Sequence, residues 1–345
     1  MTLNKKTIVH ITESFGGGVT TAINTYVKNS PSFAHHLIAV VREGDETGEE
    51  ESNLFASSTL LKRDFTCLKK CLHRIDDLKP DVIHIHSTYA GLFLRIHPKI
   101  DTQKVVYTPH GFAFLRDDHP ILKKAYYLIE KVLSKRCKVI AGCGVDEANI
   151  AQAFNKNLLT YPLVNICEKL DRHKLANKSE RPLKIGMVGR ITAQKGYDFF
   201  AKVAKKLTGK AEFIWIGGGD EKGNELLSQA GVRVTGWVKR QSVLDELEHL
   251  DVYFHTAAWD GFPVSVLEAA EMNLPVLLRE IGPFTAEGLN TLADEDIASN
   301  ELLLFLNGDK TAVDRANFNT SMIRNTHTAE NLSNSISTVY GYITG

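Results

Sequence analysis

Residues 183–196 read LKIGMVGRITAQKG, an apolar run followed by a basic turn that begins and ends with glycine. An apolar run of this length without polar alternation is typical of a strand buried on both faces of a sheet. Similar runs recur along the chain, and amphipathic stretches of helical length separate them. Strands that alternate with helices in this way predict an α/β fold with parallel sheets covered by helices.

The predicted strands fall into two series on either side of a polar linker. The first series comprises Thr7–Ile11, Leu37–Val41, Val82–His86, Val105–Thr108 and Lys138–Ala141, with helices near 20–28 and 121–135. The second comprises Leu183–Val188, Glu212–Ile216, Val232–Thr235, Val252–His255 and Pro275–Leu278. The charged, proline-ended segment 168–182 between them is typical of a linker. We therefore expect one Rossmann-like domain over residues 1–165, a linker over 166–182 and a second domain over 183–325.

The composition is that of an ordinary globular protein. The chain has 345 residues, which fits two domains. Its formal net charge is zero, which disfavours a nucleic-acid binder because such proteins are usually basic. The five cysteines are an odd number without a CxxC pair, which favours reduced thiols over disulfides or a metal site. Neither a signal peptide nor an apolar run of about 18 residues is visible, so we expect a cytoplasmic protein.

A glycine-rich segment follows the first predicted strand. Ligands of parallel α/β sheets bind beyond the carboxyl ends of the strands, so residues in such positions are candidates for a binding site. Gly16, Gly17 and Gly18 precede a helix there and would let backbone N–H groups approach an anion or a sugar. The segment lacks the GxGxxG pattern of dinucleotide-binding folds. A plain flexible turn remains an alternative.

The basic turn at 189–196 offers two cations in the corresponding place of the second series. Arg190 can bind phosphate oxygens through two hydrogen bonds, and Lys195 adds a point charge. On a diphosphate leaving group, these cations would stabilise the transition state more than the ground state, and no metal would be needed. The alternative is a solvated basic loop.

A pair of acids brackets a turn after the predicted strand Val252–His255. Residues 260–268 read DGFPVSVLE. Glu268 could accept hydrogen bonds from both ribose hydroxyls, and Asp260 could contact hydroxyls of a transferred sugar. Backbone N–H groups of the intervening turn would point into the same cleft. The alternative is that Asp260 only caps the following helix.

Together with the sequence TPHG at 108–111, these segments resemble the family-4 retaining glycosyltransferases of the GT-B fold. The family pattern is a glycine loop near the amino terminus, a His-Gly after an early strand, G-R-x(4)-K-G, and E-x(7)-E with G-F-P inside. The resemblance covers most of the chain. It implies two Rossmann-like domains that face each other across an interdomain cleft, with a last helix near 329–343 that returns to the first domain. It also implies transfer with retention at the anomeric carbon.

The resemblance further implies roles for individual residues. Arg190 and Lys195 would hold the donor diphosphate, while His110 and Asp260 would lie at the transferred sugar as the other catalytic residues. The donor-binding residues would be Gly16, Gly17, Gly18, Gly189, Val238, Gly261, Phe262, Pro263, Val264, Ser265, Leu267 and Glu268. Among these, Glu268 would bind the ribose, and Val238 would line the nucleobase pocket with its neighbours. No metal or other cofactor is expected, because the nucleotide-sugar is a substrate.

One residue departs from the family pattern. The first acid of the pair is normally Glu, whereas this chain has Asp260, which is one methylene shorter. The donor is expected to be a UDP- or GDP-hexose, and because of this departure a glucose-type sugar is not assumed.

The expected acceptor is a glycan or lipid-linked glycan of a cell-surface polysaccharide. The helix near 121–135 is basic and carries two tyrosines, which suits an anionic membrane surface. We therefore expect a cytoplasmic protein that can lie at the inner face of the cytoplasmic membrane, with no nucleic-acid partner. A solvated helix face is the alternative.

Three other functions are open to such a fold. A sugar-nucleotide epimerase would bind the same donor without an acceptor, a Rossmann dehydrogenase would need a nicotinamide, and an inactive relative would only bind. Two histidines of the predicted strand Val82–His86, His84 and His86, share one face of the sheet. They are expected in the core or at its rim, with acceptor contact by His86 as the alternative.

Overall fold

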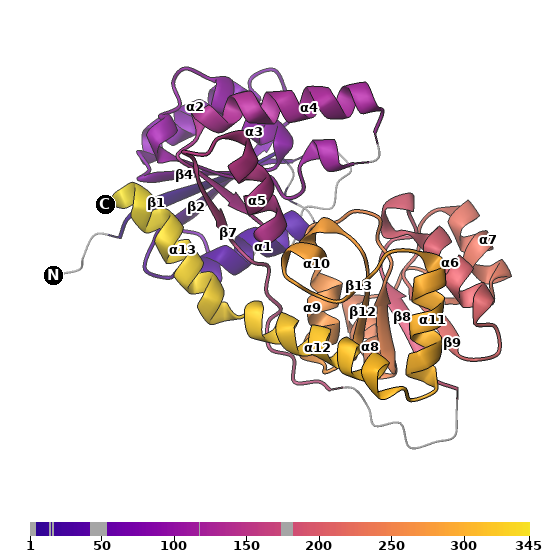
Figure 1. Cartoon of the computed structure of the whole chain (residues 1–345). Coiled ribbons are helices and arrows are strands. Elements are labelled where there is room, and N and C mark those ends of the chain that lie inside the picture. Colours follow the sequence, from indigo (N-terminus) through magenta and orange to yellow (C-terminus); the bar gives the residue numbers. More distant parts are fainter. Residues whose placement is uncertain (1–4, 14, 16, 42–53, 117, 174–181) are drawn as a thin grey trace. The chain divides into compact units, whose positions relative to one another are not determined.

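A computed structural model describes the chain except for residues 1–4, 14, 16, 42–53, 117 and 174–181. The chain divides into two compact units. Unit 1 comprises residues 1–165 together with 329–345, and unit 2 comprises residues 166–328. Each unit has its own parallel sheet with helices on both faces, which confirms the predicted α/β class (Figure 1).

The sheet of unit 1 has the strand order β3-β2-β1-β4-β5-β6-β7. Its strands are β1 (Thr7–Thr12), β2 (Ala34–Val41), β3 (Ser57–Lys62), β4 (Val82–His86), β5 (Val105–Thr108), β6 (Val139–Gly142) and β7 (Leu159–Pro162). Its α-helices are α1 (Gly17–Lys28), α2 (Cys67–Leu78), α3 (Thr88–Ile96), α4 (Pro120–Leu133), α5 (Val145–Phe154) and α13 (Ala329–Thr344).

The two faces of this sheet differ in chemistry. Side chains alternate along a strand, so Val9 and Ile11 of β1 point to one face and His10 to the other. The first face is apolar, because Val9 and Ile11 pack in one core cluster with residues of α2, α3 and α5. The second face carries histidines, and Tyr26 of α1 and Tyr340 of α13 stack or pack against them.

The sheet of unit 2 has the strand order β10-β9-β8-β11-β12-β13. Its strands are β8 (Lys184–Val188), β9 (Glu212–Ile216), β10 (Arg233–Val234), β11 (Val252–His255), β12 (Val276–Arg279) and β13 (Thr291–Leu292). Its α-helices are α6 (Tyr197–Lys206), α7 (Glu221–Gln229), α8 (Arg240–Glu248), α9 (Val264–Glu271), α10 (Gly282–Ala286), α11 (Glu295–Leu306) and α12 (Lys310–Thr326).

Both faces of this second sheet are apolar. Phe200 of α6, Trp215 of β9 and Phe254 of β11 belong to the core cluster on one face. Tyr253 of β11 and Val266 of α9 belong to the cluster on the other. The near-continuous apolar runs that predicted these strands therefore reflect burial on both sides. In the part of the chain that the structure describes, no helix is both long and apolar enough to cross a bilayer.

The sequence prediction located the interior strands and missed three others. The bounds of β4, β5, β9 and β11 are as predicted, and the other predicted strands differ by a few residues at their ends. The missed strands are β3, β7 and β13. β3 and β7 lie at the edges of their sheet, β3 is exposed at alternate positions, and β7 ends in a proline. β13 has only two residues. Such segments lack the apolar run on which the prediction depended.

Candidate active site

The basic turn and the acidic turn of unit 2 lie next to each other at the point where the strand order of the sheet reverses. From β8 the chain moves outward to β9 and β10, and it then returns to β11 on the other side of β8. Open α/β sheets bind ligands at such a switch point, beyond the carboxyl ends of the strands. Arg190 and Lys195 follow β8, and Asp260 follows β11.

A second glycine turn supports the segment that carries Arg190. Gly189 N donates to Ile216 O at 3.0 Å, and Ile191 N donates to Gly218 O at 2.8 Å. A Cβ on Gly217 would lie 2.2 Å from Gly189 O, so only glycine permits this approach. The turn at 217–219 is therefore structural.

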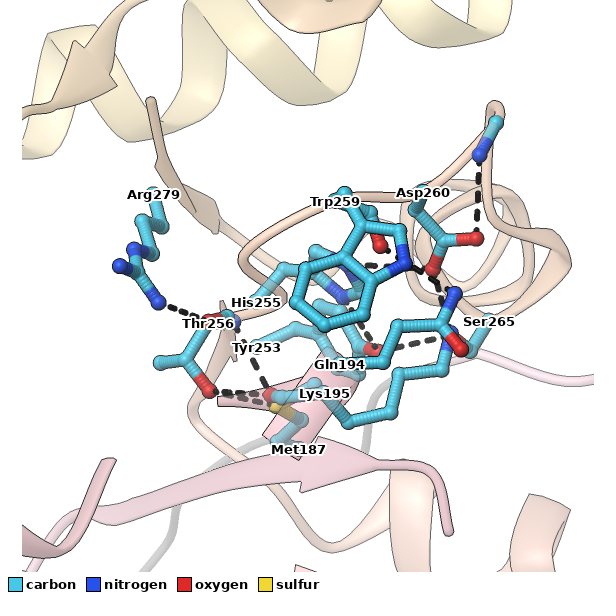
Figure 2. A network of polar contacts seen from close by, with 11 residues as sticks. Met187, Gln194, Lys195, Tyr253, His255, Thr256, Trp259, Asp260, Ser265 and Arg279 are labelled. Atoms are coloured by element: carbon cyan, nitrogen blue, oxygen red, sulfur yellow. Dashed lines mark hydrogen bonds and ion pairs between the residues drawn. The ribbon is translucent and has the colours of Figure 1, made fainter. Parts of the chain in front are cut away.

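The backbone of the basic turn is also attached to the end of β11. Gly196 has φ +69°, and a Cβ there would lie 2.0 Å from Thr256 O. The Thr256 hydroxyl donates to Lys195 O at 3.1 Å. Ala258 N donates to Gln194 O at 2.8 Å. Figure 2 shows Gln194 and Thr256 near Lys195. The turn that carries both cations is thus held between β8 and β11.

Lys195 and Asp260 form an ion pair in this site. Lys195 Nζ donates to Asp260 Oδ2, and both side chains are about four-fifths buried. The Asp260 Oδ1 atom accepts from Gly261 N at 3.1 Å. Asp260 does not cap the next helix, because α9 begins at Val264 with Pro263 as its N-cap residue. The capping interpretation is therefore wrong.

A histidine that the sequence motifs do not include lies close to Asp260 of this pair. His255 is fully buried, and its Nε2 atom lies 3.9 Å from Asp260 Oδ2 (Figure 2). That nitrogen has no hydrogen-bond partner among the described residues. Burial and the charge of Lys195 lower the pKa of His255 well below its usual value, so the ring is neutral. Its position as the last residue of a predicted strand was the available signal.

Arg190 differs from Lys195 in its surroundings. Its side chain is exposed, and within the described ranges no ion pair or hydrogen bond of its guanidinium is found. The two cations therefore start from different states. Lys195 is already neutralised by a carboxylate, whereas Arg190 is available to an incoming anion.

Glu268 lies within α9 and not at its first turn. Its side chain is buried, and Arg240 Nη2 lies 2.6 Å from its Oε1 atom. Burial raises the pKa of Glu268, and the charge of Arg240 opposes that rise. Arg240 is itself mostly exposed, so a ligand with hydroxyl groups could displace it from the carboxylate.

The remaining predicted residues of this segment divide between core and surface. Phe262 and Leu267 are buried in the hydrophobic core, so only their backbone can meet a ligand. Ser265 Oγ accepts from the Tyr253 hydroxyl at 2.9 Å. Val238 is partly exposed beside Trp237, which is 71 % exposed. This pair offers an open apolar surface next to the second glycine turn.

In unit 1, the structure covers part of the predicted glycine loop and all of the His-Gly turn. Gly16 lies outside the described residues, Gly17 begins α1, and Gly18 is exposed. His110 follows β5 with φ +52°, in the left-handed region that non-glycine residues rarely adopt. His84 is fully buried, which confirms a core position.

A cavity in unit 1 was not foreseen from the sequence. It has a volume of about 580 Å³ and lies at the carboxyl ends of β1 and β2. Its lining is mainly apolar and includes Ile11, Phe65, Leu68 and Phe93, with Arg63 at the same wall. Phe65 and Phe93 are strongly exposed, which is unusual for phenylalanine.

Models of two protein families match the chain. The model described as glycosyl transferases group 1 matches residues 182–306, and the model described as glycosyltransferase family 4 matches residues 16–155. An uncharacterized 41.2 kDa protein in the cps region of Klebsiella pneumoniae is 31 % identical over 298 residues, which are 79 % of this chain and 81 % of that protein. The UDP-Gal:α-D-GlcNAc-diphosphoundecaprenol α-1,3-galactosyltransferase of Escherichia coli is 26 % identical over 59 % of this chain and 58 % of its own length.

Solved structures share the fold of the whole chain. Anabaena HepE in complex with UDP and glucose has a TM-score of 0.77 at 13 % identity, over 97 % of this chain and 99 % of that one. The sucrose-phosphate synthase of Thermosynechococcus elongatus has a TM-score of 0.76 at 13 % identity, over 98 % of both chains. These similarities confirm the fold that the sequence motifs predicted.

Proposed function

The chain belongs to the glycosyltransferases of group 1 and family 4, and we propose that it is a retaining hexosyltransferase that uses a UDP- or GDP-sugar. The observation that carries this proposal is the Lys195–Asp260 pair at the switch point of unit 2, with Arg190 exposed on the same turn. These groups match the two things that a sugar diphosphate presents, namely an anionic diphosphate and a polyhydroxylated ring. The glycosyltransferase motifs around them support transfer over epimerisation or hydride transfer.

The ion pair is expected to exchange its partners when the donor binds. A diphosphate oxygen replaces the Asp260 carboxylate at Lys195, and the released carboxylate accepts hydrogen bonds from sugar hydroxyls. Because the pair is mostly buried, both partners are held in place beforehand, which lowers the cost of ordering them. Each charge is then satisfied in the free and in the bound state.

Arg190 and Lys195 supply positive charge where negative charge develops. When the bond between the anomeric carbon and the diphosphate oxygen breaks, the electron pair stays on the diphosphate. Two fixed cations stabilise that charge without a metal. The acceptor oxygen bonds to the anomeric carbon on the face that the diphosphate leaves, and its proton passes to the leaving phosphate.

The remaining contacts follow from the same assignment. Glu268 binds the ribose hydroxyls in place of Arg240, and the exposed surface of Trp237 and Val238 receives the base. The backbone of Gly189 and of the segment 261–267 lines the donor. In unit 1, His110 and the Gly16–Gly18 loop serve the transferred sugar.

We further propose an acceptor that is a glycan linked to a lipid diphosphate, in the synthesis of a cell-surface polysaccharide. The galactosyltransferase of Escherichia coli named above acts on a diphosphoundecaprenol-linked sugar, and the Klebsiella relative is a protein in the cps region. The apolar cavity of unit 1, with Arg63 in its wall, offers surface suited to lipid and to phosphate.

Exposed apolar side chains support a position at a membrane surface. On α4, Ile121, Leu128 and Val132 are between half and three-quarters exposed, and they share one helical face. Lys124 and Lys131 lie along one side of that face. This combination favours binding in the interface of an anionic membrane, at the inner face of the cytoplasmic membrane.

The test is turnover with purified substrates. We expect release of nucleoside diphosphate from a UDP- or GDP-hexose only when a lipid-diphosphate-linked sugar is added, and no loss of rate with EDTA. Arg190→Ala should lower kcat by about 10²–10³-fold, as removal of one charge-stabilising group does. Conversion of the donor without acceptor would instead indicate an epimerase, and loss of rate with EDTA would contradict the metal-free site.

A further inference from the structure

A connected group of histidines lies on the second face of the sheet in unit 1. His10 is on β1, His35 on β2 and His86 on β4, while His110 follows β5. The first three are at most 3 % exposed. Adjacent ring centroids along the series are 5.2–5.3 Å apart. Of these four histidines, only His110 has a role in the proposed function. The burial of the other three polar rings therefore has another cause.

One end of the series has a fixed direction of hydrogen bonding. Ser30 Oγ donates its proton to Tyr26 O at 2.6 Å. His35 Nε2 lies 3.0 Å from both Ser30 Oγ and Ser30 O. A carbonyl oxygen can only accept, and the hydroxyl proton is already used. His35 Nε2 must therefore carry a proton and donate it.

This direction determines the tautomer of every following ring. A neutral imidazole has a single N–H, so Nδ1 of His35 accepts, and His10 Nε2 donates to it at 3.0 Å. His10 Nδ1 then accepts from His86 Nε2 at 3.0 Å. His86 Nδ1 in turn accepts from His110 Nε2 at 3.0 Å. Each ring thus carries its proton on Nε2.

The other end of the series fits the same direction. His110 Nδ1 lies 3.1 Å from Cys143 Sγ. Burial raises the pKa of the Cys143 thiol, so the sulfur keeps its proton and donates it. Burial lowers the pKa of His35 and of His110 to about 4, and those of His10 and His86 well below their usual value. All members are therefore neutral near pH 7.

A metal site is the competing explanation. His10, His84 and His86 offer nitrogens that all lie within 4.8 Å of one another, which is close enough for them to bind one metal ion together. However, both ring nitrogens of His84 also have partners, Tyr340 Oη and Thr108 Oγ1, each at 2.8 Å. Since all six nitrogens of the trio are used in hydrogen bonds, no lone pair is left for an ion.

We propose that Cys143, His110, His86, His10, His35 and Ser30 form one donor-to-acceptor chain that makes His110 a positioning residue whose ring takes no part in acid–base chemistry. Its two ring nitrogens are both used, by Cys143 and by His86. This hydrogen-bonded series fixes the turn at His110 and Gly111. His110 has φ +52°, in the left-handed region that a residue with a Cβ rarely adopts. Gly111 N donates to Glu147 Oε1 at 2.5 Å on the other side.

The direct test is the tautomeric state of the rings in the full chain. Long-range ¹H–¹⁵N correlation spectra of protein labelled with ¹⁵N-histidine distinguish the two neutral tautomers and the charged ring. Single His→Gln variants assign the signals. We expect His10, His35, His86 and His110 all to be neutral with the proton on Nε2 at pH 7, with spectra unchanged by EDTA or by added Zn²⁺. An Nδ1–H tautomer, a charged ring or a metal-dependent spectrum would overturn the proposal.

The role assigned to His110 rests on the proposed function and has its own test. In His110→Gln, the amide can still donate to His86 but cannot transfer a proton, whereas His110→Ala loses the bond. We expect the Gln variant to keep the pH profile of wild type and to lose at least tenfold less kcat than the Ala variant, whose kcat should fall by about 10²-fold. Equal losses of about 10²–10⁴ in both variants would identify an acid or base. If neither wild type nor variant transfers sugar, the proposed function fails, while the spectra still decide the chain of tautomers.

Discussion

At the scale of single residues, the length of one carboxylate side chain is expected to set the choice of sugar. Asp260 stands where the family pattern that the sequence resembles has Glu, and Lys195 pairs with it at the switch point. An aspartate reaches about one bond less far than a glutamate. It therefore contacts a different hydroxyl of the sugar, or the same hydroxyl of a sugar that lies closer to the backbone. In the proposed binding mode the base and the ribose contact other residues, so we expect nucleotide binding not to depend on this length.

We therefore predict that Asp260→Glu changes donor choice and leaves nucleotide affinity unchanged. The ratio of kcat/KM between two hexose donors should change by about tenfold or more, because a misplaced hydrogen-bonding group discriminates between hydroxyl positions. UDP-glucose, UDP-galactose and GDP-mannose make a suitable panel. Asp314→Glu, on an exposed site of α12, is the matched control. Unchanged ratios would show that Asp260 does not contact the sugar.

At the scale of the elements, the sequence revealed the strands and motifs but not which residues they bring together. The basic turn and the acidic turn were both visible, since each follows an apolar run. The ion pair between Lys195 and Asp260 was not visible in the sequence, because it forms only when β11 lies beside β8, and the strand order is not written in either motif. Glu268 was expected to be open to a ribose, whereas the structure shows it beside Arg240.

The histidines of unit 1 illustrate the same limit. Their period-two spacing placed His84 and His86 on one face, and burial of that face was foreseen. Partners such as His10 and His35 come from strands that are far away in sequence and adjacent only in the sheet. Pairing across a parallel sheet leaves no local trace in the sequence, so the hydrogen-bonded series could not be predicted.

Burial of these neutral rings predicts that the fold loses stability in acid. Each ring has a lower pKa when folded than the usual value near 6.5, so the unfolded chain binds more protons. The stabilisation is complete above pH 6.5 and is lost as the pH falls toward about 4. Glu147, whose pKa burial raises to about 7, acts in the opposite direction, but the histidines outnumber it.

Urea unfolding at a series of pH values measures this effect. The free energy of unfolding should fall by about 1.4 kcal/mol per pH unit for each such histidine between these limits. In His35→Gln the dependence of the unfolding free energy on pH should be weaker by the contribution of one histidine. His249→Gln, on the surface of unit 2, should leave that dependence as in wild type. A free energy of unfolding that does not change between pH 7 and pH 5 would contradict the buried neutral rings.

At the scale of the whole molecule, the exposed face of α4 predicts binding to membranes that carry negative charge. The protein should sediment with phosphatidylcholine vesicles only when these contain phosphatidylglycerol, and salt should weaken the binding. The double variant Lys124→Ala/Lys131→Ala should weaken it by roughly tenfold or more. Phe318→Ser, an exposed apolar site in unit 2, is the control that should bind as wild type. Equal binding to neutral vesicles, or none to either kind, would remove the membrane surface as a partner.

We propose that Arg190 and Lys195 form a site for a nucleoside diphosphate, and thermal unfolding with candidate ligands tests whether that site exists. UDP, GDP, ADP, TDP and NAD are added to wild type, to Arg190→Ala and to Arg233→Ala. Arg233 is also a partly exposed arginine of unit 2. It lies beside Glu212 at the amino-terminal ends of β10 and β9, whereas Arg190 follows the carboxyl end of β8. A ligand that binds only the folded protein and is present at about 100 times its Kd adds roughly 2.7 kcal/mol to the free energy of unfolding.

We expect UDP or GDP to raise the Tm of wild type and of Arg233→Ala but not that of Arg190→Ala. No shift with any nucleoside diphosphate, an equal shift in Arg190→Ala, or a shift with NAD alone would rule out the proposed diphosphate site.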